Sequence, residues 1–490
     1  MSKKAVLALT LILLTSALLG LSMLTRGHVW GDDFAAYIDQ AKSILSHEVD
    51  TYIERNAFTV TQSSHEKGHQ MGPAAYPWGF PLLLTPVYAI KGNSPLALKL
   101  PGLLTYLSFL LVYFFLTKRH FSSTESLLAI SLFAFNPGLL SFLDYILSDI
   151  PFLFVSTLTI LIADIYSSET NTRRRQIFAA LTGLAIFMAF FIRTQGLVLL
   201  GAGLLFLGIR FLRERENRGQ IVKDLLITLA TFGLLWGASS IIFPGGQTSY
   251  LSLYADFSIN IVRSNIVSYS RLFGEFFSGL PGSKIVFGIF TIFFAIGLFL
   301  RWKADLLFIL YAGLYLLILW TWPEWQGYRF IFPMLPFFIY FVFQGARFIQ
   351  KEIPNKYQNI TSAFVYTMYI TISVLFLFVS TSNAVGNLST GRDINGPYDP
   401  FSREAYDFIK DKTPSDSIVV FFKPRAMRLM TDRDSLALTE CDRMLEGDYL
   451  ALSKKAGENL QIPPERIDEC NLPLEKVFEN RRFLVYQILK

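Results

Sequence analysis

Two adjacent carboxylates follow the first apolar segment of the chain and are the first candidates for chemistry. Asp32 and Asp33 stand a few residues beyond the apolar stretch 5–24. Carboxylates cost about 2.5 to 3.5 kcal/mol on insertion scales when they enter hydrocarbon, so a pair this close to a membrane segment suggests a function. A carboxylate with a tuned pKa can take the proton of an acceptor hydroxyl or amine during group transfer. The alternative is that the pair begins a solvated loop or caps a helix.

Aromatic residues accompany the acidic pair. Tyr37 follows Asp33 by four residues, so the two side chains would share one face of a short helix. One carboxylate of the pair would then act as a base while the other orients it or caps the helix. Further along, the run at 76–81 holds Tyr76 and Trp78, which can form a wall for a sugar or a lipid.

A second acidic site lies at the outer end of a predicted membrane segment. Asp144 and Asp149 flank a short connection that leads to Pro151. Ser148 or Asp149 can cap a helix whose first turn holds Pro151, and capping alone would explain them. Both carboxylates are also candidates for the lining of a substrate cavity on the same face, and the two roles are compatible.

Two arginines on this face are candidates for a phosphate site. Arg329 follows Tyr328 within an aromatic connection, and Arg193 lies in a short turn between two apolar segments. A guanidinium is costly near hydrocarbon unless it snorkels or is paired, so an interfacial anchor is the alternative explanation. Its planar fork also matches phosphate oxygens, which a lipid-phosphate ligand requires. We expect Arg329 to be the first phosphate ligand and Arg193 a second ligand, either of the phosphate or of the sugar ring.

The elements that must position these residues are membrane helices. Hydrophobic residues make up 52% of the 490 residues and charged residues 17%, and the mean hydropathy is +0.41. These values exclude an ordinary soluble protein. The formal charge of +6 comes from Lys and Arg between the apolar segments. Because that is the positive-inside pattern, it indicates no nucleic-acid partner.

Apolar runs predict an α-helical polytopic membrane protein with about eleven spans. The basic connections place the N-terminus in the cytoplasm and the C-terminus outside. Residues 78–91 are predicted to be an interfacial or re-entrant helix, because a further span would break the charge pattern. The predicted spans are 5–25, 95–117, 125–142, 150–167, 177–192, 195–212, 224–243, 283–300, 304–320, 328–345 and 362–382.

Two long outer segments and a C-terminal domain are predicted outside the spans. The outer segments are 26–94, which holds the acidic pair, and 244–282. Residues 1–383 form the membrane domain, and the Gly-, Asn-, Ser- and Pro-rich stretch 384–400 is a linker. Residues 401–490 are predicted to be a small extracytoplasmic α/β domain. Its predicted elements are a helix at 402–412 and strands near 417–422, 449–452 and 483–489.

The remaining candidates for a structural or functional role are two cysteines, four histidines and one basic run. Cys441 and Cys470 can pair in an oxidising compartment or stay separate thiols, since sequence does not give their distance. Solvated loop positions explain the histidines of the first outer segment better than a metal site does, and we expect neither a metal nor another cofactor. The run at 423–425 can contact substrate or form a solvated turn. The histidines in question are His28, His47, His65 and His69.

The motifs at 32–41 and 76–84 resemble those of bacterial GT-C glycosyltransferases, relatives of the protein O-mannosyltransferases and of the lipid A aminoarabinose transferase. The resemblance extends over the whole membrane core. It implies inverting transfer of a sugar from a polyprenyl-phosphate carrier, with a carboxylate of the first outer loop as the base. Spacing to Tyr37 favours Asp33 for that role. This chain has two aspartates where many relatives have Asp-Glu, so Asp32 stays a candidate.

The resulting prediction is a hexosyl- or pentosyltransferase of the bacterial inner membrane and cell envelope. A polyprenyl-phosphate sugar is the expected donor, the acceptor is a lipid, glycan or protein, and membrane lipids surround the helices. The alternative is a secondary transporter or lipid flippase, which would place ionisable residues near the middle of the bilayer. Clustering of the polar motifs on one face favours the enzyme.

Overall fold

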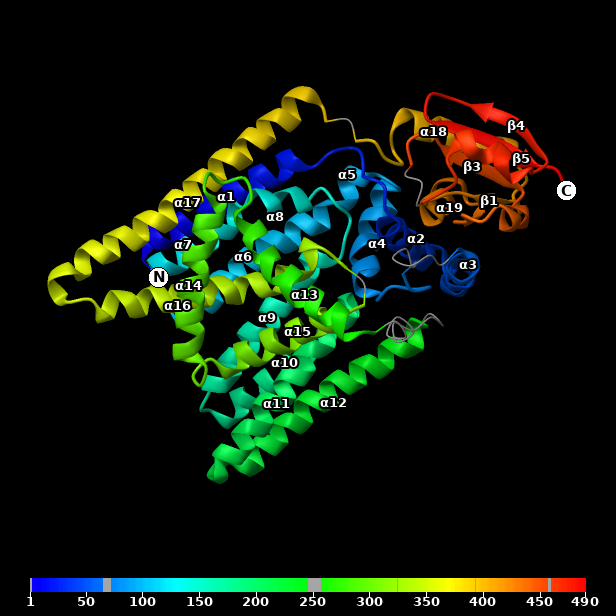
Figure 1. Ribbon diagram of the computed structural model, residues 1–490. Helices are drawn as coiled ribbons and strands as arrows, with labels where there is room; N and C mark the ends of the chain where they lie inside the picture. Colours follow the sequence, from blue (N-terminus) through cyan, green and yellow to red (C-terminus); the bar gives the residue numbers. More distant parts are fainter. Residues whose placement is uncertain (1, 65–71, 246–256, 324, 393, 457–459) are drawn as a thin grey trace.

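Helices dominate the structure, and a small sheet lies at its C-terminal end (Figure 1). The computed structural model describes residues 2–64, 72–245, 257–323, 325–392, 394–456 and 460–490. The helices up to residue 390 are α1 (Lys3–Met23), α2 (Asp33–Ser46), α3 (Val49–Gln62), α4 (Gly79–Lys91), α5 (Pro95–Leu98), α6 (Leu100–Lys118), α7 (Ser123–Ala134), α8 (Pro137–Phe142), α9 (Asp149–Ser168), α10 (Thr172–Ile192), α11 (Leu197–Arg213), α12 (Arg218–Ile242), α13 (Ile259–Leu272), α14 (Ser283–Arg301), α15 (Leu306–Thr321), α16 (Leu335–Glu352) and α17 (Asn355–Thr390).

The predicted membrane spans are confirmed as apolar helices. In the described part of the chain, nine helices are long and apolar enough to cross a membrane, and each matches one predicted span. The two remaining predicted spans are not among these nine. The span predicted at 304–320 corresponds to the shorter apolar helix α15. The span predicted at 125–142 is divided into α7 and α8, because Asn136 caps α8 and Pro137 begins it. The protein is therefore an integral membrane protein. The segment predicted at 78–91 is also helical, since α4 covers most of it.

Small residues allow two of these helices to pack backbone against backbone. Gly297 on α14 faces Gly345 on α16, and a Cβ atom added to Gly297 would lie 2.8 Å from the amide nitrogen of Gly345. A Cβ atom on Gly345 would lie 3.0 Å from the amide nitrogen of Gly297. Lipid supplies no hydrophobic force between helices, so close van der Waals contact of this kind is what holds them together.

The first outer segment, 26–94, begins with two helices, α2 and α3, which are joined by a tight turn, and it also contains α4. His47 ends α2 in the left-handed conformation, with φ of 59°. The short helix predicted to carry Asp33 and Tyr37 on one face is thus confirmed as α2. Phe34, Tyr37 and Ile38 are buried on that helix, so its N-terminal turn is held firmly against the membrane core.

A five-stranded sheet and two helices form the C-terminal unit, residues 400–490. The strand order is β2-β1-β3-β5-β4, in which β1 pairs in parallel with β2 and β3, while β5 pairs antiparallel with β3 and β4. The elements are α18 (Pro400–Lys412), β1 (Ile418–Val420), α19 (Pro424–Thr431), β2 (Asp434–Leu436), β3 (Tyr449–Ser453), β4 (Leu474–Glu479) and β5 (Phe483–Ile488). The predicted helix and three strands are present; α19, β2 and β4 were not predicted.

Two details of this region differ from or complete the sequence predictions. Helix α17 runs to Thr390, so the first part of the predicted linker 384–400 is helical. The question of the cysteines is settled in the structure, where Cys441 and Cys470 form a disulfide with Cα atoms 5.2 Å apart. The bridge joins the connection between β2 and β3 to the connection between β3 and β4.

Candidate active site

A cavity of about 400 Å³ lies where the start of α2, the loop before α16 and the start of α19 meet. Asp32 and Asp33 line it together with Arg329, as predicted from their types and positions. The C-terminal unit contributes Lys423 and Arg425 to the same wall. The other lining residues are His28, Val29, Trp30, Gly31, Phe34, Gly72, Tyr145 and Leu147. Among the described residues, two carboxylates and three cations therefore share one cavity.

Asp33 is tied to two partners. Its Oδ1 accepts a hydrogen bond of 2.7 Å from the Tyr76 hydroxyl, and its Oδ2 accepts one of 3.1 Å from Nη2 of Arg329. Burial alone would raise the pKa of Asp33, but the charge of Arg329 and the bond from Tyr76 outweigh it and hold that pKa below its usual value. Asp33 is thus a weak base with both oxygens engaged.

Asp32 has a different environment. Its Oδ1 is buried and has no hydrogen-bond partner among the described residues, while its Oδ2 lies 3.8 Å from Nζ of Lys423. Burial raises the pKa of Asp32 above its usual value, although the charges of Lys423 and Arg425 act in the opposite direction. The side chain makes no capping bond to α2, so capping does not explain it. These contacts favour Asp32 rather than Asp33 as a proton acceptor.

A buried carboxylate links the two predicted phosphate-binding arginines. Asp149 Oδ1 accepts a hydrogen bond of 2.8 Å from Nη1 of Arg193, and its Oδ2 lies 3.8 Å from Nη1 of Arg329. Both guanidinium groups also approach the ring of Phe330, at 4.7 and 5.4 Å from its centre. Negative and positive side chains thus alternate from the cavity into the helices, in the order Asp33, Arg329, Asp149, Arg193.

Ser148, in the connection before α9, bonds to this network and does not cap the helix with its side chain. Helix α9 begins at Asp149, and the Ser148 side chain makes no capping bond to it. The Ser148 hydroxyl is instead 2.9 Å from the hydroxyl of Tyr37 and 3.2 Å from Nη1 of Arg193. The Tyr37 ring also lies 4.8 Å from that of Tyr76. Two of the predicted aromatic residues therefore support the wall behind Asp33.

Seven predicted site residues do not line this cavity. Tyr37, Tyr76, Asp149 and Arg193 lie behind it in the network described above, and the other three make contacts elsewhere. Asp144 forms a buried ion pair of 2.6 Å with Lys99 and also accepts bonds from Thr25, which fixes the chain after α1. Trp78 donates from its indole to the carbonyl of Pro244 and stacks on Phe243. Tyr328 packs edge-on against Phe332. Their roles as substrate ligands remain predictions.

His28 corrects one expectation and adds a member of the cavity wall. It was expected to be solvated, but it is only 3% exposed. Its Nε2 accepts from the backbone N–H of Ile146 at 3.1 Å, so Nδ1 donates to the carbonyl of Val29 at 2.8 Å. Burial lowers the pKa of His28 to about 4, and the ring is neutral at physiological pH. His65 and His69 lie outside the described residues.

Lys423 and Arg425 are the residues that sequence analysis ranked too low. The only signal was the short basic run at 423–425, for which a solvated turn was the alternative explanation. Arg425 is 1% exposed, and its Nη1 lies 3.4 Å from the Tyr76 hydroxyl. Its Nη2 donates to the carbonyls of Gly72 and Pro73, both at 2.8 Å. No local sequence pattern predicts contacts between residues that lie so far apart in the sequence.

Comparisons with known proteins agree on the fold. The family model described as dolichyl-phosphate-mannose-protein mannosyltransferase matches residues 97–233, and no curated protein matches the chain. ArnT from Cupriavidus metallidurans bound to undecaprenyl phosphate is similar over 99% of this chain and 98% of its own, with a TM-score of 0.63 and 12% identity. AglB from Archaeoglobus fulgidus, in complex with an inhibitory peptide and a dolichol-phosphate, is similar over 98% of this chain and 74% of its own, with a TM-score of 0.57 and 11% identity.

The predicted resemblance is therefore confirmed as a shared fold. The similarity to ArnT extends through the membrane helices and the C-terminal sheet, because it covers almost the whole of both chains. The architecture is that of the GT-C type, an α-helical polytopic membrane protein with a small C-terminal α/β unit.

Proposed function

We propose that the protein is a membrane glycosyltransferase that moves a sugar from a polyprenyl-phosphate carrier to an acceptor outside the cytoplasm. The observation that carries the proposal is one cavity, on this fold, that is lined by the carboxylate of Asp32 and the guanidinium of Arg329. A base and a phosphate ligand facing the same space are the two groups that transfer from a lipid phosphate requires.

Arg329 is the proposed ligand for the donor phosphate. The fork of a guanidinium matches phosphate oxygens and neutralises their charge, which improves a phosphate as leaving group. Undecaprenyl phosphate and dolichol-phosphate in the ArnT and AglB complexes support a polyprenyl-phosphate carrier here. The donor would enter laterally from the bilayer, and a hexose or pentose would occupy the cavity. Arg193 supports Arg329 through Asp149.

Asp32 is the proposed general base. Its carboxylate takes the proton of the acceptor hydroxyl or amine as that group attacks the anomeric carbon from the face opposite the phosphate. The bond between the anomeric carbon and the phosphate oxygen breaks, the configuration inverts, and the polyprenyl phosphate leaves with its charge held by Arg329. Asp33 holds Arg329 and Tyr76 in place. The raised pKa of Asp32 suits a base, since proton transfer is most effective when the pKa approaches the working pH.

The proposed location is the bacterial inner membrane, with the N-terminus in the cytoplasm and the C-terminal unit outside. The distribution of Lys and Arg between the spans supports this orientation. The proposed division is a membrane domain at 1–383, a linker at 384–400 and an extracytoplasmic domain at 401–490. The acceptor is a lipid, glycan or protein that reaches the cavity from the outer side.

Transfer of labelled sugar by the purified protein tests the proposal. Polyprenyl-phosphate donors carrying different sugars would be offered to the wild type, Asp32→Asn, Asp33→Asn and the exposed control Asp416→Asn. Loss of a general base lowers the rate by about 10²- to 10⁴-fold, so we expect that loss for Asp32→Asn and wild-type rates for Asp416→Asn. Unchanged melting temperatures would show that the variants are folded.

The pH profile distinguishes the two carboxylates. A base must be ionised, so the rate falls as the pH drops through its pKa. Because burial raises the pKa of Asp32, the acidic limb of kcat/KM should lie above the ordinary range of an aspartate. Full activity of Asp32→Asn with loss in Asp33→Asn would move the base to Asp33. Absence of transfer by the wild type with every polyprenyl-phosphate sugar would refute the proposed function.

A further inference from the structure

The C-terminal unit forms part of the wall of the candidate active site. Lys423 directly precedes α19, and its side chain is 21% exposed and lines the cavity. Its Nζ lies 3.8 Å from Oδ2 of Asp32. Among the described residues this ammonium group makes no hydrogen bond, so its three donors are available to a ligand.

Arg329, in contrast, is already shared between two carboxylates. It donates to Asp33 at 3.1 Å and lies 3.8 Å from Asp149. Asp149 also pairs with Arg193 at 2.8 Å, so Asp33, Arg329, Asp149 and Arg193 together carry no net charge before any ligand arrives. A lipid phosphate that meets Arg329 alone would also face repulsion from Asp32 and Asp33. Arg425 lines the same cavity, but it is 1% exposed and donates to Asn56, Gly72 and Pro73. Lys423 is therefore the cation whose donors can meet an anion there.

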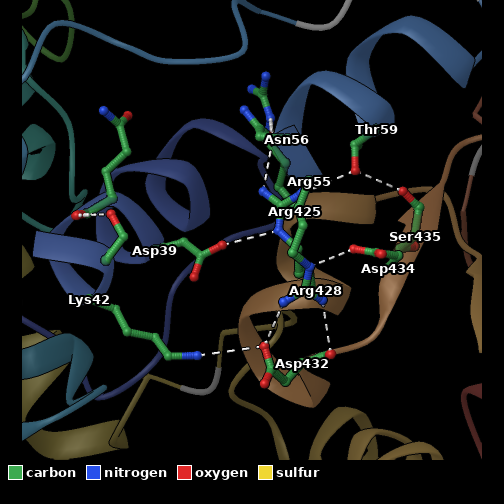
Figure 2. A network of polar contacts seen from close by, with 12 residues as sticks. Asp39, Lys42, Arg55, Asn56, Thr59, Arg425, Arg428, Asp432, Asp434 and Ser435 are labelled. Atoms are coloured by element: carbon green, nitrogen blue, oxygen red, sulfur yellow. Dashed lines mark hydrogen bonds and ion pairs between the residues drawn. The ribbon is translucent and has the colours of Figure 1, made fainter. Parts of the chain in front are cut away.

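The position of Lys423 is held by a polar interface between the C-terminal unit and the first outer segment (Figure 2). Arg428 on α19 donates to Asp39 on α2 at 3.0 Å and to Asn56 on α3 at 2.8 Å. Arg425 donates to the same Asn56 oxygen at 3.1 Å. Both arginines are buried, so the first turn of α19, and Lys423 before it, has a defined place beside Asp32.

The outer end of this interface adds further contacts. Arg55 on α3 donates to Asp434 at 2.7 Å and to Asp432 at 3.0 Å, and the Thr59 hydroxyl donates to the carbonyl of Ser435 at 3.0 Å (Figure 2). The contacts run along α3 from the cavity side to β2. The unit is thus attached by several bonds whose donors and acceptors lie far apart in sequence.

From this geometry we infer that Lys423 of the C-terminal unit binds the phosphate of the lipid-linked donor together with Arg329. The inference rests on the proposed function and extends it, because the donor site would then contain residues of both the membrane region and the C-terminal unit. Bond cleavage turns a phosphodiester with one negative charge into a phosphomonoester with up to two. An ammonium group beside the phosphate stabilises that added charge as it develops.

Binding of undecaprenyl phosphate to the full-length protein in lipid nanodiscs tests the inference without requiring turnover. The variants are Lys423→Met, Lys423→Arg and the exposed control Lys412→Met on α18, and uncharged undecaprenol is the second ligand. Hydrogen bonds to charged groups contribute about 1.5 to 3 kcal/mol, which corresponds to about 10- to 100-fold in affinity. We expect Lys423→Met to bind undecaprenyl phosphate at least 10-fold more weakly and undecaprenol unchanged.

The controls separate a direct role from a loss of structure. Lys423→Arg should keep most of the affinity because it keeps the charge, and Lys412→Met should match the wild type. An equal loss for undecaprenol, or wild-type binding of the phosphate by Lys423→Met, would overturn the inference. Wild-type protein that binds undecaprenyl phosphate through Lys423 but transfers no sugar would refute the proposed function alone.

Discussion

At the scale of single residues, the two neighbouring aspartates show how strongly the contacts of a carboxylate determine its pKa. Asp33 meets a tyrosine hydroxyl and a guanidinium, which stabilise its charged form. Asp32 leaves one oxygen buried and unbonded within the described residues, which destabilises its charged form. Sequence predicted both residues as site members, yet spacing to Tyr37 pointed to Asp33. The distinction depends on Arg329 and Lys423, which no local pattern connects to either carboxylate.

The Tyr76 hydroxyl should matter to activity, because it connects Asp33 with Arg425. Tyr76→Phe removes a bond to a charged carboxylate, so we expect kcat/KM to fall by about 10- to 100-fold. Tyr52→Phe is a matched control: its hydroxyl is buried and unbonded among the described residues. Sugar-transfer rates of both variants check the prediction, which fails if the two lose activity equally.

At the scale of elements, hydrophobic length predicted the membrane helices, whereas β2, β4 and α19 were not predicted. Runs of about 20 apolar residues have few alternatives to a span, so every long helix was found. Strand β2 has three residues and depends on parallel pairing with β1, and α19 has eight residues whose arginines are buried by partners on α2 and α3. Tertiary contacts that sequence does not reveal create both elements.

The glycine contact between α14 and α16 gives a prediction at this scale. Gly297→Leu would drive a side chain into the backbone of α16, and overpacking of this kind costs about 1 to 3 kcal/mol. Gly288→Leu on the same helix meets nothing within 4 Å and serves as the control. Thermal unfolding in detergent should show a lower melting temperature for Gly297→Leu and little change for Gly288→Leu; equal values would contradict the close packing described.

At the scale of the whole molecule, the site is assembled from segments distant in sequence. Arg329 meets Asp33 across 296 residues, and Arg425 meets Tyr76 across 349. The sequence predicted the fold class and the members contributed by the first outer segment, since those follow from composition and short motifs. It could not predict the docking of the C-terminal unit, because buried Arg–Asp and Arg–Asn pairs leave no periodic signature.

Docking of the C-terminal unit should depend on Arg428. Removal of one partner from a buried ion pair costs about 3 to 5 kcal/mol, so Arg428→Met should loosen α19 from Asp39 and Asn56. We expect faster proteolysis between α17 and α18 and a loss of sugar transfer. Arg403→Met, an exposed change on α18, is the control, and wild-type protease resistance of Arg428→Met would contradict the role assigned to the interface.

The late position of Lys423 and Arg425 in the chain has a consequence for biosynthesis. The ribosome completes α1 to α17 before these residues are made, so the nascent membrane region holds Asp32 and Asp33 without two of the cations that face them in the finished protein. The cavity wall is complete only after the C-terminal unit has folded and docked on α2 and α3. A chain interrupted before residue 423 lacks two of the residues that line the cavity. Translation past Arg425 and docking of the C-terminal unit together determine when the site is complete.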